Sequence, residues 1–238
     1  MPTWALLLVS YCLPTIIFSL VETSRLKRAA TFTWPRFVRE LYSVLGIFVF
    51  GSLVTQLLTD TSKYTLGRLR PHFLAVCRPN ITVGEEAFCG PSTAPVYVTD
   101  FECLGDPDLE EGERLERLHD ARLSFVSGHA SLSVYSMGFS VLYLQARMGN
   151  RDFRLVKPLI QVGCLLFAFF TCLTRVSDYK HHPEDVVGGA VLGAALAVLT
   201  HAFLTGRQGG PVTSATSTTS LLAVSTSRLY SREDLSLP

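Results

Sequence analysis

The sequence contains few charged residues for its length. Asp, Glu, Lys and Arg make up only 17% of its 238 positions, hydrophobic residues make up 48%, and the mean hydropathy is +0.31. Soluble globular domains carry about 25% charged residues, so this composition argues against an ordinary soluble domain. It indicates instead a protein that crosses a membrane several times and has the bilayer as its surroundings.

The sequence also lacks an internal repeat and has no dinucleotide-binding, Walker or zinc-binding motif. Its formal net charge is +1, so overall charge gives no sign of a nucleic acid or of an acidic partner. We therefore expect no nucleic acid partner, and the sequence leaves open whether the chain forms a homo-oligomer.

Five apolar runs have about the 20 residues that a helix needs to cross a bilayer core. They cover residues 3–21, 41–58, 124–145, 159–173 and 186–204. No basic residue precedes the first run and no small-residue cleavage site follows it, so we interpret it as a span and not as a signal peptide. We expect one five-span domain over residues 1–205, followed by a disordered tail at 206–238 that is rich in Ser and Thr.

Basic residues between the runs predict the orientation of the spans. Short loops rich in Lys and Arg stay on the cytoplasmic side of a membrane. Two stretches qualify, one within residues 22–40 and one after the third run, and their cations are Arg25, Lys27, Arg28, Arg36, Arg39, Arg147, Arg151, Arg154 and Lys157. The tail is then cytoplasmic, and the long polar loop at 59–122 is lumenal or extracellular, which places the protein in the plasma membrane or in a membrane of the secretory pathway.

The loop at 59–122 carries signals that suit an oxidising compartment. Asn80 begins the N-glycosylation acceptor Asn-Ile-Thr. The loop also holds Cys77, Cys89 and Cys103, and we expect two of these three to pair, although the sequence leaves open which two. The acidic run at 106–116 has no metal-ligand spacing, so we interpret it as a solvated loop or a short surface helix.

Three polar clusters lie where apolar runs begin or end. They read Lys63-x6-Arg70-Pro71, Ser127-Gly128-His129 and Arg175-x5-His181-x3-Asp185. Ionisable residues at such boundaries are costly and indicate a functional site, although the third cluster alone could be a solvated loop. In this order the three clusters are the signature of the type 2 phosphatidic acid phosphatases, a family that this chain resembles.

The resemblance extends to the animal lipid phosphate phosphatases and covers residues 3–205. It implies an all-α fold, a polytopic membrane helix bundle of the type 2 phosphatidic acid phosphatase and vanadium haloperoxidase kind. The chain departs from the family pattern at Thr174, Val126 and Pro183, none of which replaces a residue with a chemical role. The family has six spans, and the first run here resembles its second, so we expect one N-terminal span to be missing and Met1 to lie outside.

The resemblance also implies a reaction, the magnesium-independent hydrolysis of phosphatidate, lysophosphatidate, sphingosine 1-phosphate and ceramide 1-phosphate. It implies that His181 is the nucleophile that forms a phosphohistidine, that His129 is the general acid and base, and that Asp185 orients His181 through a hydrogen bond. Cations and backbone N–H groups at a helix start bind phosphate, and the residues expected to do so are Lys63, Arg70, Arg175, Ser127, Gly128 and His129. For Arg68 and Arg122, a plain membrane-interface anchor is an equally good interpretation.

We expect no metal and no cofactor, because Lys and Arg supply the positive charge and the nearby acids form no recognisable ligand set. Two alternatives share the resemblance. The vanadium haloperoxidases carry the same signature, but they are soluble, and five apolar runs argue against them. A catalytically inactive relative that acts as a membrane interaction protein is the other, and phosphate release by the purified protein would distinguish it.

Overall fold

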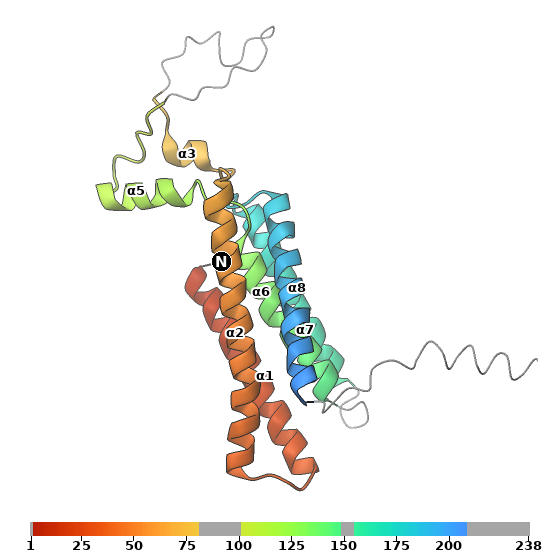
Figure 1. Cartoon of the computed structure of the whole chain (residues 1–238). Coiled ribbons are helices and arrows are strands. Elements are labelled where there is room, and N and C mark those ends of the chain that lie inside the picture. Colours follow the sequence, from red (N-terminus) through yellow and green to blue (C-terminus); the bar gives the residue numbers. More distant parts are fainter. Residues whose placement is uncertain (1, 81–100, 149–154, 209–238) are drawn as a thin grey trace, which may run out of the picture. The chain divides into compact units, whose positions relative to one another are not determined.

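The structure, a computed structural model, describes residues 2–80, 101–148 and 155–208. These residues form seven helices and no strand (Figure 1). The helices are α1 (Thr3–Arg28), α2 (Trp34–Leu66), α3 (Phe73–Cys77), α5 (Glu111–Asp120), α6 (Gly128–Arg147), α7 (Val156–Ser177) and α8 (Pro183–Gln208). The predicted all-α fold is therefore confirmed.

The chain divides into two units, residues 1–202 and 203–238, and the boundary falls inside α8. The account below concerns the first unit. In the second unit the described residues are the last turns of α8, which continue the helix to Gln208. The rest of the predicted tail lies outside the described residues.

Four of the helices in the described ranges are long and apolar enough to cross a membrane: α1, α2, α7 and α8. They correspond to four of the five predicted runs. The fifth run, at 124–145, corresponds to α6, which is long enough but contains serines that lower its hydropathy. Four of these serines, Ser131, Ser133, Ser136 and Ser140, are completely buried, so α6 faces other helices more than the surroundings of the bundle.

The helices extend beyond the apolar runs that predicted them. The segment 22–40, expected to be a loop, is helical except for the short turn between Arg28 and Trp34. Pro35 stands in the first turn of α2, where a missing N–H costs no hydrogen bond. An apolar run marks the part of a helix that needs a nonpolar environment, and polar residues continue the same helix at both ends.

α6 lies between α1 and α2 on one side and α7 and α8 on the other (Figure 1). Glycines bring α8 against it. A Cβ added at Gly193 would lie 2.3 Å from the carbonyl oxygen of Ser131, and one at Gly189 would lie 2.5 Å from that of Ser127. Spacing of small residues by four positions allows such close backbone approach between membrane helices. This contact fixes the start of α8 beside the start of α6.

Aromatic side chains hold α1, α2 and α6 together. The ring of Phe18 from α1 lies 5.5 Å from that of Phe48 in α2 and 4.7 Å from that of Tyr143 in α6, in edge-to-face arrangements. Phe48 also lies 5.4 Å from Phe139. Helices in a bilayer associate through close packing and hydrogen bonds, because lipid tails are as apolar as the side chains. These contacts therefore set the relative position of the three helices.

The long loop has a small core of its own. Phe73, Cys77 and Ala121 are buried together, and α3 packs against α5. A disulfide joins Cys77 to Cys103, which confirms that two of the three loop cysteines pair; Cys89 lies outside the described residues. α5 has no buried residue, as expected for a short surface helix in the acidic run.

Candidate active site

The three sequence clusters meet at one end of the helix bundle. Lys63 stands in the last turn of α2, Arg175 in the last turn of α7, and Ser127 caps the start of α6. A cavity of about 550 Å³ opens there, and the cluster residues that line it are Lys63, Arg70, Gly128, His129, Arg175 and His181. Residues separated by more than a hundred positions thus line one cavity.

His181 is buried in the turn between α7 and α8. Its backbone N–H donates to the carbonyl of Arg175 at 3.2 Å, which ties the turn to the end of α7. Its Nδ1 lies 2.8 Å from the carbonyl oxygen of Ser124. A carbonyl can only accept, so Nδ1 carries the proton and Nε2 keeps its lone pair. None of the contacts made by the described residues involves Nε2.

Among the described residues no hydrogen bond joins Asp185 to the ring of His181, which differs from the expectation. Pro183 starts α8, and this places Asp185 in the first turn of that helix. Its carboxylate accepts hydrogen bonds from the hydroxyl of Ser124 at 2.5 Å and from the backbone N–H of His182 at 3.0 Å. Ser124 therefore links the two groups, holding Asp185 with its hydroxyl and His181 with its carbonyl.

Arg68 completes the surroundings of Asp185. Its Nη1 donates to Asp185 Oδ1 at 2.7 Å, and its Nη2 lies 3.4 Å from Glu184 Oε2. A fully buried carboxylate needs such charged partners, because burial otherwise disfavours its ionised form. Arg122, which the sequence could not distinguish from Arg68, instead lies over the ring of Phe73 at 5.8 Å. The structure therefore separates the two arginines.

Arg70 lies in the cavity with its guanidinium held by Asp120. Nη1 and Nη2 each donate to one carboxylate oxygen of Asp120 at 2.6 Å. The backbone N–H of Arg70 donates to the carbonyl of Ala121 at 2.9 Å, so the loop core positions the residue. This paired arrangement is the one in which an arginine also binds a phosphate group.

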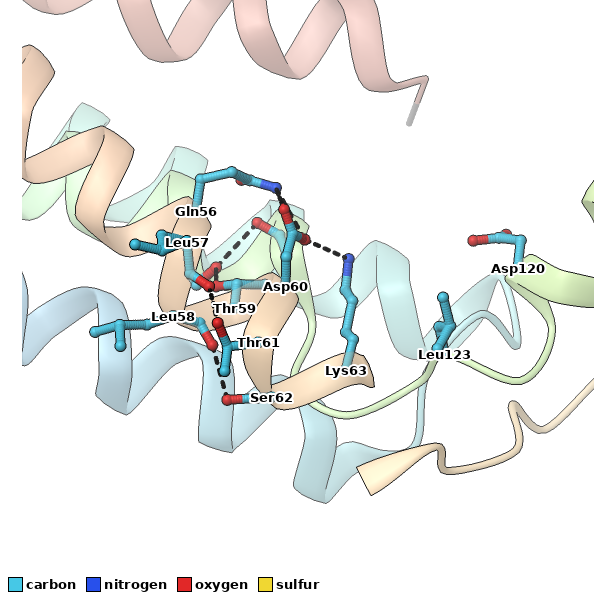
Figure 2. A network of polar contacts seen from close by, with 12 residues as sticks. Gln56, Leu57, Leu58, Thr59, Asp60, Thr61, Ser62, Lys63, Asp120 and Leu123 are labelled. Atoms are coloured by element: carbon cyan, nitrogen blue, oxygen red, sulfur yellow. Dashed lines mark hydrogen bonds and ion pairs between the residues drawn. The ribbon is translucent and has the colours of Figure 1, made fainter. Parts of the chain in front are cut away.

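Lys63 belongs to a polar network along α2. Figure 2 shows the carboxylate of Asp60 between the amide of Gln56, at 3.1 and 3.2 Å, and the ammonium of Lys63, at 3.6 Å. A Cβ added at Gly128 would lie 3.3 Å from Lys63 Nζ, so the absence of a side chain there lets the ammonium reach the start of α6. Lys63 thus stands beside the helix terminus expected to bind phosphate.

The start of α6 contributes less backbone than expected. The N–H of Ser127 donates to the carbonyl of Asp185 at 3.0 Å, so of the three N–H groups expected to bind phosphate only those of Gly128 and His129 remain. The hydroxyl of Ser127 and Nε2 of His129 are buried and have no hydrogen-bond partner among the described residues. Groups of this kind are costly unless a ligand or water satisfies them.

Arg175 is buried at the end of α7, and its Nη2 donates to Asp178 at 2.9 Å. Positive side chains thus surround His181, and burial together with them lowers its pKa. Burial is the larger cause and the charge of Arg70 the next, and the pKa falls from 6.5 to about 3. His181 is therefore neutral over the whole physiological range, as a nitrogen nucleophile must be.

One wall of the cavity is apolar. Leu6 and Leu7 of α1, Leu53 of α2 and Leu132 of α6 line it. Leu7 is 44% exposed and Leu53 62%, so this wall continues to the outside of the bundle between α1 and α2. The cavity can accept a molecule with an anionic end and an apolar end.

Sequence reasoning missed three side chains at the site. Ser124 and Asp120 were not singled out, although each stands a few residues before Ser-Gly-His, and Lys180 lines the cavity next to the predicted His181.

Outside the site, the side chain of Asn80 is exposed and its backbone N–H donates to Glu102. The other two residues of its acceptor lie outside the described ranges. Within those ranges no group of three His, Cys, Asp or Glu side chains could hold a metal ion.

Fold and cavity define a polytopic helical membrane protein with a cationic, histidine-containing site at one end of its helices. The profile of the PAP2 superfamily matches residues 44–208, more than half of the chain, and the chain belongs to this superfamily. It is an integral membrane protein with several spans. No solved structure matches it significantly.

Curated proteins with similar sequences carry phosphatase names. Phospholipid phosphatase 2 of Homo sapiens is 43% identical over 187 residues, which cover 78% of this chain and 58% of the human protein. Phospholipid phosphatase 1 of Mus musculus is 42% identical over 169 residues, 71% of this chain and 54% of the mouse protein. A putative phosphatidate phosphatase of Drosophila melanogaster is 40% identical over 178 residues, which cover 74% of this chain and 45% of the fly protein. The chain spans about half the length of these relatives.

Proposed function

We propose that this chain hydrolyses lipid phosphate monoesters without magnesium, through a phosphohistidine on His181. The observation that carries the proposal is the hydrogen bond from His181 Nδ1 to the carbonyl of Ser124, which leaves Nε2 as a lone-pair donor. This nitrogen belongs to a residue that shares a cavity with Lys63, Arg70 and Arg175. A transferring phosphoryl group needs such cations, because negative charge spreads over its oxygens.

The reaction would take place in two displacements. Nε2 of His181 attacks phosphorus, the bond from phosphorus to the ester oxygen breaks, and the departing alcohol takes a proton from His129. Water then attacks the phosphohistidine, His129 accepts a proton from that water, and the phosphorus–nitrogen bond breaks to release inorganic phosphate. Ser124 keeps the proton on Nδ1 in the first step, and Asp185 opposes the positive charge that develops on the ring.

The apolar wall supports a lipid as the substrate. With the phosphate against Lys63 and Arg70, a hydrocarbon chain would lie along Leu7 and Leu53 and leave the bundle between α1 and α2. Burial of a chain contributes about 0.8 kcal/mol per methylene whichever headgroup it carries. We therefore expect phosphatidate, lysophosphatidate, sphingosine 1-phosphate and ceramide 1-phosphate all to be hydrolysed, at the lumenal or extracellular face.

A trapping experiment tests the nucleophile. The purified chain in detergent with EDTA is mixed with lipid labelled in its phosphate and quenched in base, because phosphohistidine is stable to base and labile to acid. We expect labelled protein from the wild type, none from His181→Ala, and label from His182→Ala, whose ring bonds to the carbonyl of Leu69. Removing a catalytic group costs several orders of magnitude in rate, so His181→Ala should release no phosphate above background.

A substrate panel tests the lipid specificity separately. The four lipids are compared with glucose 6-phosphate and isoprenyl diphosphate in mixed micelles with EDTA, with phosphate release as the measurement. Preference for the lipids supports the proposal. Preference for either comparison substrate would overturn the lipid assignment, and absence of release from all six would favour an inactive interaction protein.

A further inference from the structure

Three side chains on one face of α2 follow each other along the active-site cavity. Leu53, Gln56 and Lys63 all line it, and the side chain of Gln56 is exposed. A helix turns about 100° and rises about 1.5 Å per residue, so these positions lie within about a quarter of its circumference, with Gln56 between the other two. A polar amide thus stands between the apolar part of the cavity and an ammonium group.

Asp60 fixes the orientation of this amide. Figure 2 shows its carboxylate next to Gln56, whose Nε2 donates to both oxygens at 3.1 and 3.2 Å, and next to the ammonium of Lys63 at 3.6 Å. A carboxylate only accepts hydrogen bonds, so it binds the NH2 side of the amide. The carbonyl oxygen, Oε1, is then the atom that Gln56 offers to a ligand, and it is a hydrogen-bond acceptor.

The four lipids expected as substrates differ in the groups close to the phosphate ester. Lysophosphatidate carries a free hydroxyl there, sphingosine 1-phosphate an ammonium and a hydroxyl, and ceramide 1-phosphate an amide N–H and a hydroxyl. In phosphatidate both remaining glycerol oxygens are esterified, and no donor is left. With the phosphate at Lys63 and the hydrocarbon chain along Leu53, these groups lie at the level of Gln56.

We propose that Gln56 is a specificity-determining residue, which accepts a hydrogen bond from a donor on the lipid backbone and so favours the other three lipids over phosphatidate. This inference rests on the proposed function, because it places the phosphate at Lys63. One hydrogen bond gives about a two- to tenfold preference. Phosphatidate is then still hydrolysed, in line with the breadth expected from burial of the chain.

The alternative is that Gln56 has a structural role alone. Its amide would then hold Asp60 and, through it, Lys63, and loss of the amide would affect every phosphate ester alike. The two roles differ in whether the effect depends on the donor of the lipid. A lipid with the donor and a matched lipid without it therefore separate them.

The substrate test uses lysophosphatidate and its 2-deoxy analogue, in which a hydrogen replaces the free hydroxyl and the acyl chain is the same. The measurement is kcat/KM of the purified full chain in mixed micelles with EDTA. We expect the wild type to favour lysophosphatidate about two- to tenfold. Gln56→Met, which keeps the length of the side chain without its amide, should hydrolyse the two lipids equally.

Thr61→Val is the matched control variant. Thr61 belongs to the same part of α2, but its hydroxyl donates to the carbonyl of Leu57 and it does not line the cavity (Figure 2). This variant should keep the wild-type preference for lysophosphatidate.

Asp60 is a positioning residue in this arrangement. Asp60→Asn keeps an oxygen that can accept from Gln56, so the ratio of the two kcat/KM values should stay near that of the wild type, even where both values fall. Asp60→Leu releases the amide and should bring the ratio towards one. A wild-type ratio in Asp60→Leu would overturn the positioning role.

Binding without turnover separates this inference from the proposed function. His181→Ala is titrated with the two lipids, and the shift of its thermal unfolding midpoint reports their relative affinities. A preference for lysophosphatidate that disappears when Gln56→Met is added supports the inference, even where the wild type releases no phosphate and the proposed function alone fails. Equal binding of the two lipids, or a preference that Gln56→Met leaves unchanged, would overturn the inference and leave the phosphatase reaction standing.

Discussion

The carboxylate of Asp120 occupies both terminal nitrogens of the Arg70 guanidinium, at 2.6 Å each. These are the two donors with which an arginine binds a phosphate group side by side. A substrate phosphate must therefore share or displace Asp120, whose side chain is 55% exposed and free to move outward, whereas that of Arg70 is 10% exposed and held by the loop. Asp120 holds Arg70 ready for an anion and competes with that anion at the same time.

Removing the charge of Asp120 should therefore strengthen the binding of phosphate. For Asp120→Asn we expect the inhibition constants of inorganic phosphate and vanadate to fall about threefold, in proportion to the modest strength of a partly exposed ion pair. The control is Glu116→Gln, which removes the same charge from the same helix but does not line the cavity. Weaker inhibition in Asp120→Asn would mean that Asp120 orients Arg70 and does not compete with substrate.

Ser124 should influence the rate of reaction more than the binding of substrate. Its hydroxyl donates to Asp185 at 2.5 Å, and Ser124→Ala leaves this buried carboxylate short of one donor. Loss of such a bond costs roughly 1–3 kcal/mol, which corresponds to about a five- to 150-fold fall in kcat if the cost appears in the transition state. KM should change little.

A matched variant makes the Ser124 experiment specific. Ser133→Ala removes another fully buried hydroxyl, whose hydrogen-bond acceptor among the described residues is the carbonyl of Ala130 in its own helix. We expect near-normal kcat for that variant. Equal losses in the two variants would show that Ser124 acts through general packing and not through Asp185.

The low pKa of His181 predicts how stability changes with pH. Burial, followed by the charge of Arg70, lowers the pKa from 6.5 to about 3, so between these values the unfolded chain binds a proton at His181 that the folded chain does not. Stability at this site therefore rises with pH across that window and falls as the medium becomes more acidic. The thermal unfolding midpoint should fall less steeply with acid in His181→Gln than in the wild type.

The same pKa can be measured directly. Nitrogen NMR can be recorded on protein that carries 15N-labelled histidine, with the His181 signals assigned from their loss in His181→Gln. At a pH low enough to protonate both ring nitrogens of a histidine in a peptide, His181 should still show one protonated and one free ring nitrogen. A His181 ring that becomes fully protonated near 6.5 would contradict the cause assigned here. Arg70→Gln should raise this pKa, because it removes the second largest contribution.

The sequence predicted which residues would gather but not how they would bond. The alternation of the spans placed Lys63 and Arg175 at helix ends on one side of the membrane, with His181 in the turn that follows Arg175, and these residues line one cavity. Spacing does not set side-chain torsions, so it could not show that Ser124 stands between His181 and Asp185. The same limit explains why Arg68 and Arg122 looked equivalent, although one contacts Asp185 and the other lies over Phe73.

For the fold, likewise, the sequence predicted the helices but not their full length or their packing. Apolar runs located the helices, because a membrane span needs a continuous apolar surface, but they missed the polar turns by which α2 extends from Trp34 to Leu66. The central place of α6 was not visible either. Its serines reduce the apolar signal, and only the contacts with Gly189 and Gly193 explain why small residues line it.

Glycosylation of Asn80 tests the orientation that places the active site at the lumenal or extracellular face. The side chain is exposed in the loop that follows α2, at the same end of the helices as the active-site cavity, and transfer of a glycan requires that this loop enter the lumen. The basic residues near Arg25 and Arg147 predict that the opposite ends of the helices lie in the cytoplasm. In cells with a secretory pathway, the wild-type protein should therefore migrate faster after glycosidase treatment. Untreated Asn80→Gln should migrate like the treated wild type.

Thr82→Ala serves as the matched variant, because it removes the acceptor while keeping the asparagine. Loss of the shift in both variants supports a lumenal loop, and an Asn80 that is never modified in such a membrane would count against the orientation and against a lumenal active site.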